Sequence, residues 1–215
     1  MLELPESYEA VICFVEELRN GSVWTSEENT PEIVVSIPLA CLGIDFRNEE
    51  KVLDYKELME AIKEQEQSLI LPGFKYEDAW CLGQSLYTKA IERHLPLFME
   101  VFVNGGVRFA AASPKAHNNL ADWVRRKRNL TLRMGQSSYL TDVMFKEHGI
   151  SLEAFGMDLV NFGLGGGSIP IAVSDIGIIG AVTVSGLPNI DDHNLAVECI
   201  AELLGQDFND LKLSQ

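Results

Sequence analysis

The chain has 215 residues, of which 47% are hydrophobic, enough for one substantial core and a small appended unit. Its formal net charge of −15 and pI near 4.6 disfavour nucleic acid and anionic membranes as partners, because both bind basic surfaces. No apolar run approaches the roughly 20 residues of a membrane span. The first residues are acidic, whereas a signal peptide begins with a basic region, so we expect a cytoplasmic protein.

The cysteines are the next constraint. Cys13, Cys41, Cys81 and Cys199 are widely separated, and no two of them have C-x-x-C spacing. This pattern argues against a zinc site and against a disulfide scaffold. We therefore expect reduced, mostly buried thiols and no metal site.

Residues 1–45 are predicted to form an extension of the main domain. Apolar residues from Leu4 to Leu18 recur at spacings of four and three, which indicates an amphipathic helix. Residues 32–37, bounded by two prolines, are typical of an edge strand. We expect the extension to add to the main sheet or to dock on a neighbouring subunit, and residues 46–215 to form the main domain.

Two helices are predicted next. Residues 54–67 form a charged helix with Leu58 and Ile62 facing inward. A second helix, ending before Pro96, has an apolar stripe at helical spacing: Tyr76, Ala79, Trp80, Gly83, Leu86, Tyr87, Ala90 and Ile91. Glycine inside a helix costs about 1 kcal/mol relative to alanine, so Gly83 indicates close packing against a strand.

The remainder of the chain alternates hairpins and helices. Asn104-Gly105-Gly106 separates two apolar runs and is a strong hairpin signal. A second pair of strands is predicted at 169–174 and 178–185, and helices are predicted at 119–134, 138–148 and 191–204. Consecutive strands joined by tight turns imply antiparallel pairing. We predict an α+β fold, an antiparallel sheet of about five strands with helices on both faces.

The helix at 119–134 contains four consecutive basic residues, 125–128, in an otherwise acidic chain. Lys127 falls near the middle of its apolar stripe. A lysine in that position either snorkels its ammonium to the edge or meets a buried acceptor. A further hypothesis is that Lys127 points into a pocket and binds a small carboxylate or phosphate.

The turn after this helix is a second candidate. Gly135 suits a left-handed helix end and Ser137 suits an N-cap, and capping alone accounts for both residue types. The functional alternative makes the turn of Gly135, Gln136, Ser137 and Ser138 one wall of a ligand pocket.

A glycine-rich loop and a histidine complete the set of candidates. Residues 163–168 match neither a P-loop nor a dinucleotide fingerprint. The N–H groups of Gly165, Gly166 and Gly167 either form an anion nest or belong to a plain approach to the next strand. His193 follows two acidic residues at a helix start, where such residues ordinarily act as caps; it is either a satisfied polar residue or part of the pocket.

Three separated blocks resemble one family. Residues 77–83 (EDAWCLG), 122–139 (DWVRRKRNLTLRMGQSSY) and 180–193 (GAVTVSGLPNIDDH) are similar, in this order, to the GlcG/HbpS-like superfamily, also called the haem-degrading-domain superfamily. More narrowly they resemble its uncharacterised cytosolic subfamily of bacteria and fungi. The resemblance runs from about residue 65 to about 204. It implies a profilin-like, three-layer arrangement and assembly into oligomers, but no particular reaction.

Two departures from the family pattern concern haem, the cofactor that the resemblance suggests. Gln136 stands where the family usually has histidine, and the family's later H-G-G motif has no histidine here at Leu164 or Gly165. Imidazole is a favoured ligand of haem iron. We therefore predict that haem is bound weakly or not at all.

Two classes of function follow. The first is a small-ligand binding module, whose pocket uses Lys127, the turn at Gly135–Ser138, the glycine loop and His193 to hold a small anion or a cofactor. The second is a non-enzymatic interaction protein in which the same residues build subunit contacts. We expect a homo-oligomer of dimers. The sequence assigns no catalytic residue, and the lack of a G-x-S-x-G elbow argues against a serine hydrolase.

Overall fold

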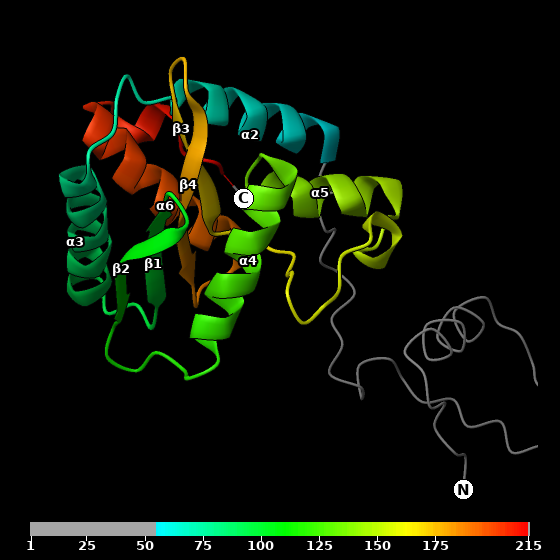
Figure 1. The fold of residues 1–215 in the computed structure, drawn as a ribbon, viewed down its shortest axis with the longest axis horizontal. Helices are drawn as coiled ribbons and strands as arrows, with labels where there is room; N and C mark the ends of the chain where they lie inside the picture. Colours follow the sequence, from blue (N-terminus) through cyan, green and yellow to red (C-terminus); the bar gives the residue numbers. More distant parts are fainter. Residues whose placement is uncertain (1–54, 215) are drawn as a thin grey trace, which may run out of the picture. The chain divides into compact units, whose positions relative to one another are not determined.

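The computed structural model describes residues 55–214 (Figure 1). The helix and edge strand predicted within residues 1–45, together with Cys13 and Cys41, lie outside the described residues. Of the other two cysteines, Cys199 is buried and Cys81 is exposed, and both are free thiols.

Four antiparallel strands form the sheet in the order β2-β1-β4-β3. The first hairpin joins β1 (Phe98–Val103) to β2 (Gly106–Ala112), and the second joins β3 (Ser168–Val173) to β4 (Gly177–Ser185). Asn104 and Gly105 both have positive φ, as a two-residue hairpin turn with the right twist requires. The predicted antiparallel sheet is confirmed with four strands, and Leu71 adds an isolated parallel bridge to Val173.

Helices cover both faces of the sheet, as predicted (Figure 1). On one face lie α3 (Tyr76–Glu92) and α6 (Asn189–Leu204), and on the other lies α4 (Leu120–Met134). The remaining two helices, α2 (Tyr55–Ser68) and α5 (Ser138–His148), pack against each other. No helix within residues 55–214 combines the length and apolar character that crossing a membrane needs.

The two faces of the sheet differ in chemistry, because successive side chains of a strand point to opposite sides. The face under α3 and α6 is apolar and forms the main core, with Met99, Val101 and Val184 fully buried. The face under α4 carries Glu100, Thr183 and Ser168 in register on three strands. Buried polar groups need hydrogen-bond partners, so α4 must present polar side chains to this face.

The stripe predicted for α3 is partly wrong. Ala79 and Leu86 are buried, but Tyr76 is 56% and Trp80 is 60% exposed. The predicted apolar stripe is wider than the face of α3 that the sheet covers. Trp80 lies at the border of that face, edge-on to the ring of Phe109. The prediction for Gly83 is confirmed, since a Cβ there would lie 2.1 Å from the ring of Phe109 on β2.

Candidate functional site

A depression of about 300 Å³, which we call the turn depression, lies between α2, the turn joining α4 to α5, and the β3–β4 hairpin. Its floor is apolar, and its rim carries the polar side chains of α2 and of the turn. The lining consists of Lys63, Glu66, Gln67, Leu69, Ile70, Gly135, Gln136, Leu140, Ile169, Pro170, Ala172 and Ile178.

Among the described residues, Glu66 supplies the carboxyl group that lines this depression. Its Oε1 accepts a hydrogen bond of 2.9 Å from the backbone N–H of Ser137. Burial raises the pKa of Glu66 above its ordinary value, although hydrogen bonds from Ser137 oppose the shift. Sequence reasoning missed Glu66, because it is one carboxylate among several on a charged helix until α2 packs against the turn.

The turn itself is built as its residue types predict. Gly135 has φ of +70° and its N–H donates to the carbonyl of Thr131, so the left-handed helix end is confirmed. Ser137 is confirmed as the N-cap of α5, since its Oγ accepts from the N–H of Leu140 at 3.0 Å. The side-chain amide of Gln136 donates to Thr141 Oγ1 at 3.1 Å, which holds Gln136 at the edge of the depression.

Two serines of the turn face inward. Ser137 and Ser138 are both fully buried. Ser138 Oγ accepts from the backbone N–H of Ser168 at 3.1 Å and so joins the turn to β3. These two residues position the turn, whereas Gly135 and Gln136 are the turn residues that line the depression.

Lys127 pairs with a buried acid. Its Nζ lies 3.0 Å from Asp192 Oδ2 and 3.2 Å from Ser185 Oγ, and its side chain is only 5% exposed. Of the alternatives open for this lysine, the structure shows the buried acceptor, and snorkelling to the edge is wrong. The ammonium reaches neither water nor the turn depression, because a carboxylate from the start of α6 meets it inside the protein.

Asp192 is held from several directions. Oδ1 accepts from the backbone N–H of Leu187 at 3.0 Å, and Oδ2 accepts from that of Gly186 at 3.3 Å. Burial raises the pKa of Asp192 to about 6, although Lys127 and both N–H groups favour the ionised form. The pair joins α4 to α6 past the end of β4.

The glycine loop adjoins this pair. A Cβ on Gly166 would lie 1.9 Å from the carbonyl oxygen of Asn189, and one on Gly167 would lie 2.4 Å from that of Val184. Gly165 and Gly167 also have φ near +110°, a region that glycine alone adopts easily. Close approach to the start of α6 and to β4 therefore accounts for these glycines.

His193 is a neutral core residue. It is fully buried, and its Nε2 lies 2.6 Å from Gln65 Oε1. Because the Gln65 amide donates to the carbonyl of Leu211, Gln65 Oε1 accepts and His193 Nε2 carries the proton. Within the described residues His193 Nδ1 has no partner, and burial lowers the pKa of His193 to about 3.

The candidate residues therefore occupy three settings. Lys127 lies beside the glycine loop, Gly135 and Gln136 line the turn depression, and His193 lies in the core against Gln65. Among the described residues, the lining of the depression contains no His, Cys, Met or Tyr, the side chains that hold haem iron in proteins, so this lining does not fit haem. Within residues 55–214, no group of three or more His, Cys, Asp or Glu side chains is placed to hold a metal ion.

Comparison with known proteins identifies the family. The family model described as "Haem degrading protein HbpS-like" matches residues 74–201. A UPF0303 protein of Rhizobium etli is 43% identical over 153 residues, which cover 71% of this chain and 93% of that protein. A UPF0303 protein of Acidobacterium capsulatum is 44% identical over 155 residues, covering 72% and 94%.

Solved structures share the fold. The crystal structure of the Ybr137w protein matches with a TM-score of 0.65 at 22% identity, covering 76% of this chain and 99% of that one. The structure of a PduOC–haem complex matches with a TM-score of 0.52 at 17% identity, covering 60% and 94%. The sequence relatives and the family model carry the assignment: this chain belongs to the HbpS-like family, together with the UPF0303 proteins.

Proposed function

We propose that the protein binds a small molecule and that the turn depression holds it. One observation carries the proposal: Glu66 and Gln136 present polar groups beside an apolar floor, in a hollow of about 300 Å³. An apolar concavity with a few fixed polar groups is the usual form of a small-molecule site. Within the part of the chain that the structure describes, the lining of the depression holds no nucleophile next to a base, so the proposal is binding without an assigned reaction.

The chemistry of the rim indicates the class of ligand. The Glu66 carboxyl accepts hydrogen bonds, and the ammonium of Lys63 is paired with Glu60 at 2.7 Å. The anionic guest expected from the sequence depended on Lys127, whose charge Asp192 compensates. We therefore propose a ligand with an N–H or O–H donor on a compact apolar body, in place of a carboxylate or phosphate.

A matched series of probes tests this proposal. Cyclohexylamine, cyclohexanol and cyclohexanecarboxylate share one apolar body and differ only in the head group. We expect saturable NMR shifts of the Ile70, Ile169 and Ile178 methyl groups, largest with the amine and smallest with the carboxylate. Glu66→Gln should weaken the amine response at least fivefold. Equal responses to all three probes, or an unchanged response in Glu66→Gln, would refute the assignment.

Self-assembly is a second candidate, supported by a different surface. Leu159 is 60% and Val160 is 72% exposed, yet arginines of α4 hold their backbone. Arg125 Nη2 donates to the carbonyl of Val160 at 2.7 Å, and Arg126 Nη1 donates to that of Leu159 at 3.2 Å. Apolar side chains presented on an ordered backbone are suited to a subunit contact.

Light scattering at micromolar concentration tests assembly. The proposal expects a species larger than the 23.9 kDa chain, and expects Leu159→Ser/Val160→Ser to shift the mass downwards. A purely monomeric wild-type protein would contradict it. An oligomer that the double substitution leaves unchanged would place the contact elsewhere.

A further inference from the structure

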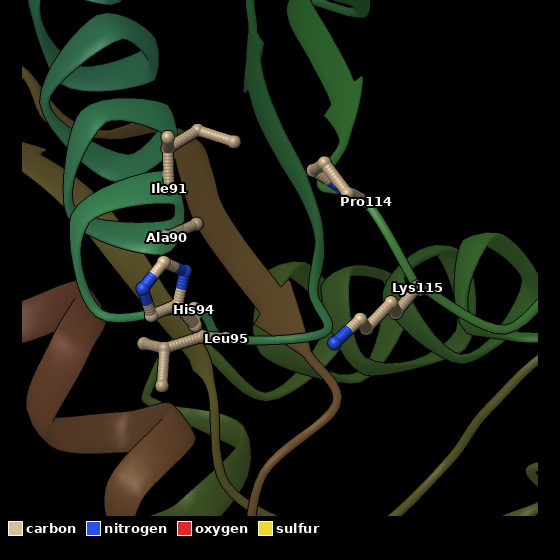
Figure 2. Close-up of a pocket in the computed structure, with 6 residues that line it drawn as sticks. All are labelled: Ala90, Ile91, His94, Leu95, Pro114 and Lys115. Atoms are coloured by element: carbon tan, nitrogen blue, oxygen red, sulfur yellow. The ribbon is translucent and has the colours of Figure 1, made fainter.

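A second cavity, of about 130 Å³, lies at the C-terminal end of α3, next to the turn that follows β2 (Figure 2). Two basic residues and four apolar ones line it: His94, Lys115, Ala90, Ile91, Leu95 and Pro114. Figure 2 shows the ammonium of Lys115 pointing from the turn back towards the end of α3 that carries His94. The two cavities share no lining residue.

Both basic residues occupy backbone conformations that favour glycine. His94 has φ of +55° just beyond α3, where its N–H donates to Ile91 and that of Leu95 donates to the carbonyl of Ala90. Glycine is the usual residue at such a helix end. Lys115 has φ of +71° after Pro114, in a turn closed by a hydrogen bond from the next residue's N–H, and glycine is again preferred there. Strained residues of this kind concentrate at functional sites.

Hydrogen bonds fix the two segments against each other. Ser113 Oγ accepts from the N–H of Leu97 at 2.8 Å and donates to the carbonyl of Leu95 at 2.5 Å. The N–H of Ser113 also donates to the carbonyl of Leu97 at 2.8 Å. Because Ser113 is buried and adjoins the turn, the backbones of His94 and Lys115 are held at a defined separation.

The two basic side chains at this cavity have no polar partner among the described residues. Within residues 55–214, neither the imidazole of His94 nor the ammonium of Lys115 forms a hydrogen bond or an ion pair, in a chain whose formal net charge is −15. The ammonium and the imidazole N–H line the same cavity and offer two donors to one carboxylate, and the rest of the lining is apolar.

We propose that this cavity binds a short-chain aliphatic carboxylate. The carboxylate lies between Lys115 and His94, and the tail packs against Ile91, Leu95 and Pro114. A cavity of about 130 Å³ is small, which limits the tail to a short chain of about four carbons. This site does not depend on the turn depression or on what binds there.

Titration of the full-length protein with butyrate tests the proposal, followed by NMR of isoleucine and leucine methyl groups and of the histidine rings. We expect saturable shifts at Ile91, Leu95 and His94, and none with butan-1-ol or n-butylamine at equal concentration. Lys115→Met and His94→Gln should each weaken butyrate binding at least tenfold. Lys63→Met, which removes an ammonium at the other depression, should leave it unchanged.

Glycine substitutions separate binding from folding. Lys115→Gly and His94→Gly relieve the positive φ, so they should leave the melting temperature unchanged or raise it while abolishing the butyrate response. The proposal is overturned if butyrate gives no saturable shift at these residues, if n-butylamine gives the same shifts, or if Lys115→Met still binds with wild-type affinity.

Discussion

Replacing Lys127 by methionine tests the buried ion pair, because it keeps the packing of the stem and removes only the charge. Asp192 is 1% exposed as a side chain and would lose the ammonium that lies 3.0 Å from it. Breaking a buried pair by removing one partner costs about 3–5 kcal/mol, since the remaining charge stays buried. We expect Lys127→Met to lower the free energy of unfolding by that amount at pH 7.5.

An exposed ion pair serves as a matched control, because it shows what losing a pair costs when the remaining charge is not buried. Lys63 and Glu60 lie 2.7 Å apart with side chains 47% and 67% exposed, so Lys63→Met should cost about 0.5 kcal/mol. The double variant Lys127→Met/Asp192→Asn removes both buried charges and should recover at least about 2 kcal/mol of the loss. Guanidinium denaturation at fixed protein concentration measures all four proteins. If Lys127→Met loses no more than Lys63→Met, the pair does not stabilise the fold as argued.

Three further predictions concern the glycine loop, the α5 cap and the buried histidine. Gly166→Ala should lower the free energy of unfolding by about 1–3 kcal/mol in urea denaturation, because its Cβ would meet the Asn189 carbonyl. Gly73→Ala is the control and should cost little, because nothing lies within 4 Å of the added Cβ. Equal costs for the two variants would contradict the close approach at Gly166. Ser137→Ala should lower it by about 1 kcal/mol, and no loss would mean that the cap contributes nothing. Burial lowers the pKa of His193 to about 3 from 6.5, so between these pH values the unfolded chain binds a proton that the native protein does not, and stability falls as pH falls. The wild-type protein should lose about 1.4 kcal/mol per pH unit below pH 6.5, which is about 2 kcal/mol by pH 5. His193→Gln should not show this loss, and parallel stability curves for the two proteins between pH 7 and pH 5 would contradict the prediction.

Local sequence chemistry determined the elements and their ends. Asn104-Gly105 predicts a two-residue hairpin, and both residues adopt the positive φ that such a turn needs. Gly135 and Ser137 predict a helix end and a helix start, and the structure has both within one turn. These signals act between residues a few positions apart, so the sequence alone reveals them, and the antiparallel α+β class follows from their order.

Tertiary structure decided which polar groups meet. Lys127 finds Asp192 65 residues away, and Glu66 reaches the turn across 71 residues. Periodicity places a side chain on the face of a helix, but it does not say which element covers that face. The residues predicted to share one pocket therefore lie in a buried ion pair, in the core and at the turn depression. The reason is that α4 and α6 pack on opposite faces of the sheet, whereas α2 packs against α5.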